Sequence, residues 1–274
     1  MNLERTVNEK NEIPEFYDDL PFWSCHSGIT LLDNIPLLDN VEILDIGCGT
    51  GFPTLELAQR IGERSRIYGV DLWEEGIVIA RQKAINKRIS NVEFAIEDAK
   101  KLSYGEERFE IVVSNNGISA IDDKKNVLKE VYRVMKKNGK LIFTAILPDT
   151  MKEFYNLLIQ AMEEVGIDSA SEQVKMHISK RRLALNEYKK LLCEIGFEVK
   201  EYSNHSYNMN FRDSKVIFEY DFFKSHFIKG WYEIVEETKR KQVFENLMNK
   251  LDLLAINDKR ISLNIDYTLI ICEK

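Results

Sequence analysis

The sequence is poor in cysteine and lacks any long apolar run. Its 274 residues include four cysteines, Cys25, Cys48, Cys193 and Cys272. No CxxC pair or Cys/His cluster with zinc-ligand spacing occurs, so neither a metal site nor a disulfide framework is indicated. Nowhere do 18 apolar residues follow one another, and the polar stretch 1–16 has no apolar signal core, so we expect no membrane span. Reduced thiols favour a cytoplasmic protein.

An excess of basic residues is also missing. The formal net charge is −7, whereas proteins that bind nucleic acids usually carry a basic surface. We therefore expect a small-molecule substrate and no nucleic-acid partner. Hydrophobic residues make up 44% of the chain and charged residues 30%, which is typical of a globular protein able to bury a core. The length fits one large domain, or one domain with a sizeable insertion.

Apolar runs and amphipathic segments alternate between residues 42 and 147. Strands are predicted at 42–47, 66–72, 92–98, 109–115 and 140–147, and the helices between them include 52–63, 74–87 and 123–139, the last ending at Gly139. This alternation predicts an α/β fold with a doubly wound, mostly parallel sheet.

The rhythm changes after Leu147. Short strands are predicted near 197–202 and 263–273, and helical insertions at 148–182 and 204–260. We therefore divide the chain into an N-terminal helical lid (1–40), an α/β core (41–147), and a remainder (148–274) that completes the sheet and adds a helical cap.

The stretch ILDIGCGTGF, residues 43–52, joins the first predicted strand to a helix through three glycines. A glycine-rich turn before a helix lets the backbone approach a ligand closely, and the helix start offers free N–H groups. Gly47, Gly49 and Gly51 give GxGxG, whereas the dinucleotide fingerprint GxGxxG would need glycine at Phe52. No lysine follows Gly51, so the turn is not a GxxxxGK[ST] phosphate loop either.

Two acids end the strands that follow this turn. Asp71 comes about 20 residues after Gly51, where a carboxylate accepts hydrogen bonds from both hydroxyls of a ribose. Asp98 ends the third predicted strand, where a carboxylate can accept a hydrogen bond from an exocyclic amine while the Ala99 N–H faces a ring nitrogen. The sequence thus predicts a nucleoside site.

Five segments in order, EILDIGCGTG, YGVDL, IEDAKKL, FEIVVSNNGI and KKNGKLIF, resemble the successive motifs of class I S-adenosylmethionine (SAM) dependent methyltransferases, closest to the ubiquinone/menaquinone and biotin-pathway branch. The resemblance implies a seven-stranded Rossmann-like sheet, SAM as cofactor and methyl transfer as the reaction. It covers residues 40–147 strongly and the later strands weakly.

The family's cofactor contacts carry over to matching positions. The resemblance implies that the turn from Gly47 to Gly51 cradles the aminocarboxypropyl tail of SAM and that Asp45 helps to hold its ammonium. It also implies that Leu72 flanks the adenine and that the backbone of Asn115 lines the floor near the methyl group. The roles of Asp71, Asp98 and Ala99 agree with those derived above.

The methyl acceptor is less defined. Tyr17 and Trp23 lie where related enzymes carry a lid, and simple packing explains them equally well. Asn116 faces either the acceptor or only the turn, because asparagine also favours turns for backbone reasons. No general base and no [DN]PPY motif of amino-methylating nucleic-acid enzymes follows the fourth strand.

The leading hypothesis is methyl transfer from SAM to a small or medium organic acceptor by in-line displacement, at carbon, oxygen or nitrogen. One alternative is a catalytically silent SAM-binding protein acting as a sensor or partner subunit. Another is methylation of a carboxylate held by a carrier protein, which is implied by the similarity of the layout after the fifth strand to the cap of the biotin-pathway enzymes. A nicotinamide oxidoreductase is disfavoured by Phe52 and by the lack of a second catalytic domain.

Overall fold

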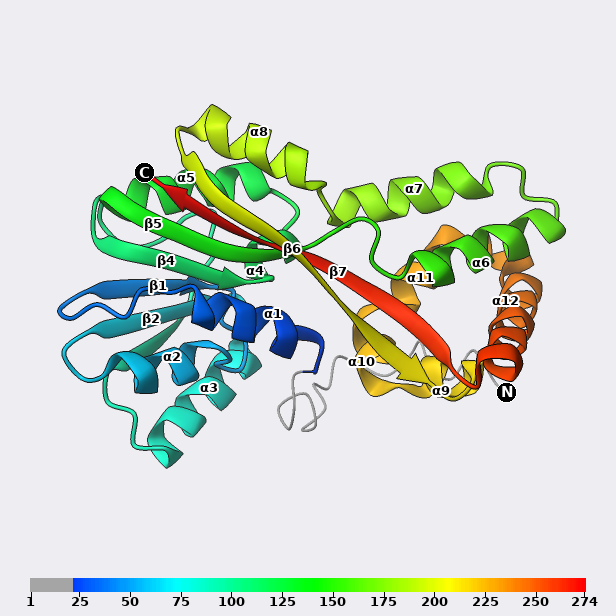
Figure 1. Cartoon of the computed structure of the whole chain (residues 1–274), viewed down its shortest axis with the longest axis horizontal. Helices are drawn as coiled ribbons and strands as arrows, with labels where there is room; N and C mark the ends of the chain where they lie inside the picture. Colours follow the sequence, from blue (N-terminus) through cyan, green and yellow to red (C-terminus); the bar gives the residue numbers. More distant parts are fainter. Residues whose placement is uncertain (1–21) are drawn as a thin grey trace. The chain divides into compact units, whose positions relative to one another are not determined.

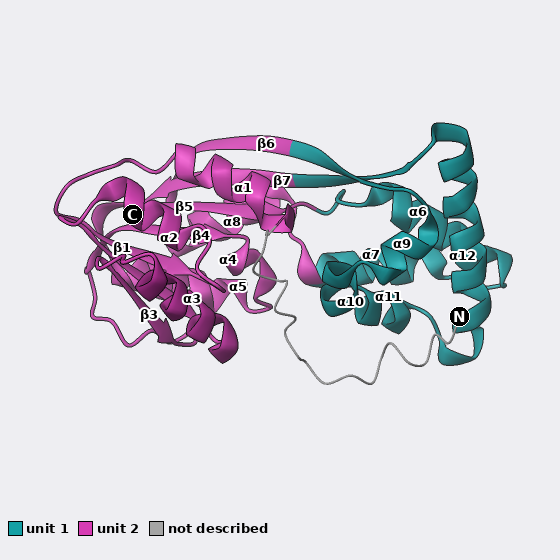
Figure 2. Cartoon of the chain, turned by 90° about the horizontal axis from the view of Figure 1, so that it is seen from below, with its two compact units in different colours: residues 1–19, 148–180, 206–266 teal, residues 20–147, 181–205, 267–274 magenta. Residues whose placement is uncertain are grey.

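The computed structural model describes residues 22–274 and divides them into two compact units. The unit that we call the α/β unit contains residues 22–147, Arg181–His205 and Tyr267–Lys274, and the helical unit contains Pro148–Lys180 and Ser206–Asp266. Figure 2 shows the two units in different colours. Two long strands run through the boundary, so each contributes residues to both units.

The described residues form seven strands in one sheet (Figure 1). The strands are β1 (Glu42–Ile46), β2 (Arg66–Asp71), β3 (Val92–Ile96), β4 (Phe109–Asn115), β5 (Met135–Ile146), β6 (Glu198–Phe211) and β7 (Ile261–Glu273). Their order is β3-β2-β1-β4-β5-β7-β6. The first five pair in parallel, and β7 pairs antiparallel to β5. The doubly wound, mostly parallel sheet predicted from the alternating pattern is confirmed.

Twelve helices accompany the strands within residues 22–274. They are α1 (Phe22–Asp33), α2 (Thr54–Ile61), α3 (Glu74–Asn86), α4 (Gly117–Ala120), α5 (Lys124–Val134), α6 (Lys152–Glu164), α7 (Ala170–Arg181), α8 (Leu185–Ile195), α9 (Ser214–Glu219), α10 (Asp221–His226), α11 (Ile228–Ile234) and α12 (Glu237–Asp258). No helix among these residues is long and apolar enough to cross a bilayer.

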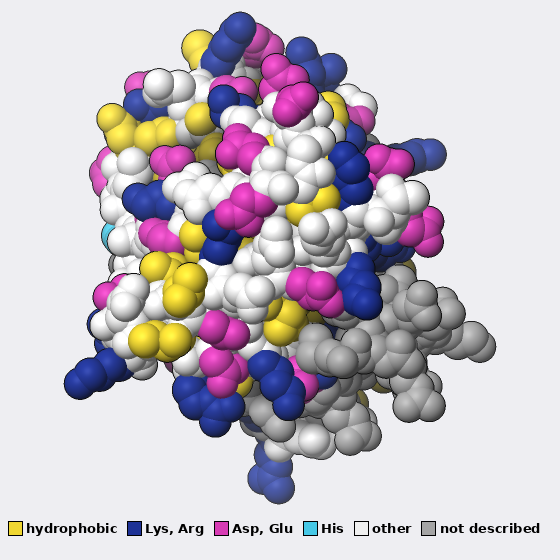
Figure 3. Space-filling model, turned by 90° about the vertical axis from the view of Figure 1, so that its right-hand side faces the viewer, with side chains coloured by type: hydrophobic (Ala, Val, Ile, Leu, Met, Phe, Trp, Pro, Cys, Tyr) yellow, Lys and Arg dark blue, Asp and Glu magenta, His cyan; other side chains and the backbone are white. Residues whose placement is uncertain are grey.

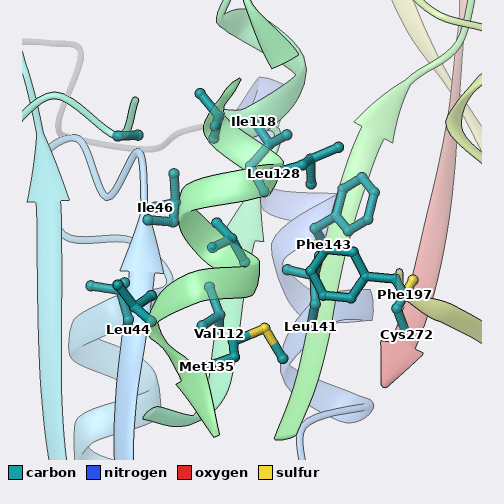
Figure 4. Close-up of a cluster of buried hydrophobic side chains, with 14 of the residues drawn as sticks. Leu44, Ile46, Val112, Ile118, Leu128, Met135, Leu141, Phe143, Phe197 and Cys272 are labelled. Carbon is teal, nitrogen blue, oxygen red and sulfur yellow. The ribbon is translucent and has the colours of Figure 1, made fainter. Parts of the chain in front are cut away.

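Helices cover both faces of the sheet in the α/β unit. One face packs against α5 and α8 through a core that includes Val112, Phe143 and Tyr188, part of which is drawn in Figure 4. The other face packs against α1 and α2 through Leu31, Leu57 and their neighbours, and against α3 through a smaller cluster. Strands β1 and β4 are thus buried on both sides, as their continuous apolar runs predict.

The end of one predicted helix was wrong. The helix expected at 123–139 ends at Val134, and Gly139 lies inside β5 instead of stopping the helix. The pairing of β4 with β5 shifts between Phe109 and Ile111, which marks a bulge. A Cβ at Gly139 would lie 2.8 Å from the carbonyl oxygen of Lys136, so glycine fits this bulge for steric reasons. Pairing with β4 thus overrides the helical pattern of the sequence.

Aromatic side chains fill the core of the helical unit. Phe154 of α6 lies with its ring centroid 4.2 Å from that of Trp231, whose indole N–H donates to the hydroxyl of Tyr155 at 3.3 Å. Phe218 and Phe223 are buried in the same cluster. These aromatics stabilise the unit by packing. On the face shown in Figure 3, acidic and basic side chains are interspersed, with no single-sign patch among the coloured residues.

Candidate functional site

The chain turns sharply where β1 ends and α2 begins. Three glycines in this turn have positive φ angles, +74° at Gly47, +52° at Gly49 and +98° at Gly51. A Cβ would lie 2.7 Å from the Cα of Gly117 if placed at Gly47, and 2.8 Å from Cδ1 of Leu55 if placed at Gly51. At Gly49 it would meet no atom of the described chain within 4 Å. The middle glycine therefore faces open space, where a ligand can approach the backbone.

The packing of the third glycine and of the residue after it explains the GxGxG spacing. A Cβ at Gly51 would also lie 3.3 Å from the Cβ of Ala80, so Gly51 itself permits the close packing for which GxGxxG uses a later glycine. The ring of Phe52 is half-buried and faces α1. A Cβ at Gly28 of that helix would lie 2.3 Å from this ring. Position 52 therefore packs α1 onto the turn.

Asp71 connects the turn to the end of β2. Its Oδ2 accepts the backbone N–H of Gly49 at 2.9 Å, and its Oδ1 accepts the N–H of Trp73, also at 2.9 Å. The side chain is partly exposed. Because each carboxylate oxygen can accept two hydrogen bonds, both oxygens keep capacity for hydroxyl donors from a ligand.

Asp45 is the most deeply buried acid of the site. Its side chain is fully buried in β1, and its Oδ2 accepts the hydroxyl of Thr54 at 2.5 Å. Its Oδ1 has no hydrogen-bond partner among residues 22–274. Burial raises the pKa of Asp45 to about 7, the negative charge of Asp71 adds to the rise, and the Thr54 hydrogen bond opposes it. A buried acceptor without a partner is costly unless a ligand or water meets it.

Apolar side chains are exposed beside the predicted adenine contacts. Leu72, directly after β2, is 62% exposed. Ile96, which pairs with Asp71 in the register of β2 and β3, is 45% exposed. Asp98 is half-buried, with its Oδ1 accepting the N–H of Lys100 at 2.9 Å, and Ala99 is buried. These strand ends supply apolar surface and a carboxylate side by side, as a purine requires.

A hydrogen-bonded network joins the end of β4 to α1. Oδ1 of Asn115 accepts the hydroxyls of Ser27 at 2.7 Å and Thr144 at 2.9 Å, and its Nδ2 donates to the carbonyl of Ser24 at 2.9 Å. Asn116 donates from its side chain to Ser27 at 2.9 Å and from its backbone to Thr144 at 3.1 Å. The two asparagines thus fix α1 to the sheet.

The two readings of Asn116 can be compared with its geometry. Its φ is +62°, a left-handed conformation that asparagine adopts more readily than most residues. Its side chain also bonds with Ser27 and Thr144 in the network, and its place against an acceptor stays a prediction. Trp23 is half-buried in α1. Tyr17 lies outside the described residues.

Sequence reasoning missed several residues of this region. Ser27, Gly28 and Thr144 were not singled out, because a hydroxyl or a glycine in a helix or strand carries no motif and its partner lies far away in sequence. The amine of Lys83 on α3 donates to the carbonyl of Thr50 at 3.1 Å and so connects this helix to the glycine turn. Only the exposure of Ile96 could have been anticipated, from its place at a strand end.

The residues present fit SAM. A site with two acidic side chains, Asp45 and Asp71, suits the cationic sulfonium and ammonium groups of SAM. It would suit a ligand with a negatively charged phosphate less well. The open side of Gly49 leaves room for the tail, and Asp45, whose side chain is fully buried, can act on the ammonium through water or backbone.

Comparison with known proteins gives the same assignment. A family model described as a methyltransferase domain matches residues 37–217. A ubiquinone/menaquinone biosynthesis C-methyltransferase from Hydrogenovibrio crunogenus is 30% identical over 178 residues, which are 60% of this chain and 68% of that protein. A demethylmenaquinone methyltransferase from Alkalihalophilus pseudofirmus is 31% identical over 114 residues, 42% of this chain and 48% of that protein.

A more distant relative has another acceptor in its name. A malonyl-[acyl-carrier protein] O-methyltransferase from Bacillus anthracis is 27% identical over 153 residues, 56% of this chain and 53% of that protein. The chain thus spans only about half the length of several curated relatives that it matches.

Solved structures agree on the fold. The YcgJ protein of Bacillus subtilis superposes with a TM-score of 0.59 at 20% identity, over 91% of this chain and 98% of that one. At this identity the likeness shows the fold alone. The family model covers more than half of the chain, and the chain therefore belongs to the methyltransferase domain family, as a class I SAM-dependent methyltransferase of the ubiquinone/menaquinone branch.

Proposed function

We propose that the residues around the glycine turn hold SAM so that its methyl group passes to a small or medium organic acceptor by in-line displacement. SAM supplies a methyl group on a sulfonium, which leaves as a neutral thioether. The new bond forms between the acceptor atom and the methyl carbon while the carbon–sulfur bond breaks. The protein therefore has mainly to position the acceptor and exclude water.

Each contact of the cofactor has a proposed residue. Asp71 holds the ribose hydroxyls, and Asp45 helps to hold the ammonium through water or backbone. Leu72 flanks the adenine, Asp98 and Ala99 read its edge, and the backbone of Asn115 lines the floor. The single observation that carries the proposal is the open space at Gly49, where a Cβ would meet no atom of the described chain within 4 Å, because a ligand can approach the backbone of the turn there.

The acceptor is proposed to be a small molecule in the cytoplasm. The net charge of −7 and the sequence Asn116-Gly117-Ile118, in place of a [DN]PPY motif, weigh against nucleic acid. The four cysteines are free thiols, which supports a reducing compartment. Quinone-precursor rings are the first acceptors to test, because the relatives with 30–31% identity are named for them. The carrier-bound carboxylate named for another relative comes next.

The decisive experiment is incubation of the purified chain with methyl-labelled SAM and each acceptor in turn. Label in the acceptor, with S-adenosylhomocysteine formed in equal amount, supports the proposal. Tight SAM binding without transfer to any acceptor would favour the silent sensor or partner subunit. No SAM binding at all, with binding of a nicotinamide dinucleotide instead, would overturn the proposed site.

A further inference from the structure

The outer side of α3 borders an open groove on the α/β unit. The groove lies between this helix and the edge strand β3, has a volume of about 670 Å³, and exposes mainly apolar surface. Its lining includes Arg81, Ile85, Arg88, Ile89, Val92 and Phe94. Because β3 stands at the end of the strand order, no further strand of the described chain covers this edge. None of these residues belongs to the proposed cofactor site.

The C-terminal half of α3 and the turn that follows it carry a local positive charge. Residues 76–92 contain four basic residues and no acidic one, although the whole chain has a net charge of −7. Lys83 is turned toward the carbonyl of Thr50, so the outward cations are Arg81, Lys87 and Arg88. Arg81 also donates to the carbonyl of Phe94 at 2.6 Å. The guanidinium of Arg81 therefore covers the free edge of β3, and the Arg81 side chain stays exposed.

Acidic groups near this face are few. Glu93, at the groove, pairs with Arg66 at 3.2 Å, and Glu74 and Glu75 lie in the first turn of α3. Charges beyond about 8–10 Å are largely screened at physiological ionic strength. Acidic residues farther away than this therefore have little effect on the local field around Arg88.

Two large apolar side chains stand out on the same helix. Ile85 is 68% exposed and Val78 57% exposed. The two residues are seven positions apart, which is about two helical turns, so both lie on the outer side. The inner side of α3 packs on the sheet through Ile77 and Ala80. The helix is thus fixed to the protein and presents apolar tips among basic side chains.

We propose that this face docks on a membrane surface that contains anionic phospholipids. Basic side chains beside exposed apolar ones are the combination that lies at an anionic lipid interface, with the cations at the head groups and the apolar tips below them. The groove favours lipid over an acidic protein, because its lining is apolar and offers few hydrogen-bonding groups besides the arginines. Docking is peripheral, reversible and weakened by salt.

The test is co-sedimentation of the full chain with lipid vesicles. We expect binding to vesicles of phosphatidylcholine and phosphatidylglycerol in equal parts, loss of binding at high salt, and none to phosphatidylcholine alone. Arg88→Glu is expected to lower the partition coefficient roughly 30-fold, because one basic contact is lost and one repulsion is added. Ile85→Gln should lower it several-fold, and both variants should bind SAM like the unaltered chain.

Matched controls come from α12. Lys241→Glu and Ile256→Gln change an exposed lysine and a 75% exposed isoleucine outside the proposed face, and they should leave vesicle binding unchanged. The proposal would be overturned by equal binding to both vesicle types or by no binding at low salt. It would also be overturned if the Arg88→Glu variant kept both its vesicle binding and its SAM affinity. Capture of an acidic carrier protein that Arg88→Glu abolishes, without vesicle binding, would also overturn it in favour of a protein partner.

Discussion

The N–H of Gly49 donates to Oδ2 of Asp71 at 2.9 Å, so the glycine turn and the end of the neighbouring strand are held together before any ligand arrives. The carboxylate fixes the backbone of the turn and keeps lone pairs that the proposed ribose contact would use. Preorganisation of this kind lowers the ordering cost of binding.

Asp71→Ala should weaken SAM binding by about 2–3 kcal/mol, because charge-assisted hydrogen bonds to the ribose are lost. Titration calorimetry measures the change. Asp258→Ala, at an exposed position of α12, is the control and should bind normally. An Asp71→Ala protein with unchanged affinity would remove the ribose role.

Gly49→Val should abolish SAM binding and leave the fold largely intact, because the side chain would project into the open space beside the turn. Gly62→Val is a matched control, since Gly62 also has a positive φ, +78°, and free space around its Cβ. Both variants should lose about 1–3 kcal/mol of stability through backbone strain. Only the first should lose binding, and equal binding by the two would contradict close approach at Gly49.

Asp45 should make SAM affinity depend on pH. Its pKa is raised to about 7, and the ionised form attracts the ammonium of SAM, so affinity should fall roughly ten-fold from pH 8 to pH 6. Asp45→Asn should bind weakly at both pH values and flatten this profile. A profile that keeps its slope in the variant would assign the titration to another group.

The same acid should lower stability at high pH. The folded chain keeps this proton up to pH about 7, whereas the unfolded chain releases it near 3.8. Unfolding therefore releases a proton in this window, and the free energy of unfolding falls as pH rises through it. Denaturant unfolding should show Asp45→Asn gaining stability relative to the unaltered protein at pH 8 but not at pH 4.

Gly28→Leu should detach α1 from the turn, because a Cβ at this position would already lie 2.3 Å from the ring of Phe52. We expect a loss of about 1–3 kcal/mol in urea unfolding, the usual cost of overpacking. The double variant with Phe52→Ala should recover part of that loss. A strictly additive double variant would show that the ring is not what the side chain meets.

The sequence was sufficient to predict the parts of the fold and of the site that depend on local pattern. The glycine turn, Asp71 and Asp98 stand in segments whose strand character is plain, and the structure places all three at strand ends on one side of the sheet. The ring of Phe52 shows where local reasoning stops. Its effect depends on Gly28, 24 positions earlier in the sequence.

Contacts between segments far apart in the chain could not be predicted from the sequence. The hydrogen bond between Ser27 and Asn115 joins residues 88 positions apart. The end of α5 at Val134 depends on the pairing of the next residues with β4. In both places tertiary partners outweigh local preference, and a single sequence gives no sign of which partners meet.

The stacking of His205 on Tyr267, with ring centroids 5.2 Å apart, has a consequence for how the chain is assembled. These residues are the last and the first of the α/β unit on either side of Ser206–Asp266. Residues 206–266 therefore leave the α/β unit and return to it at neighbouring positions. A tight reverse turn between β6 and β7 would suffice to connect the two strands in their place. A form of the chain without these residues would keep all five parallel strands, β1 to β5, which carry the glycine turn and Asp71.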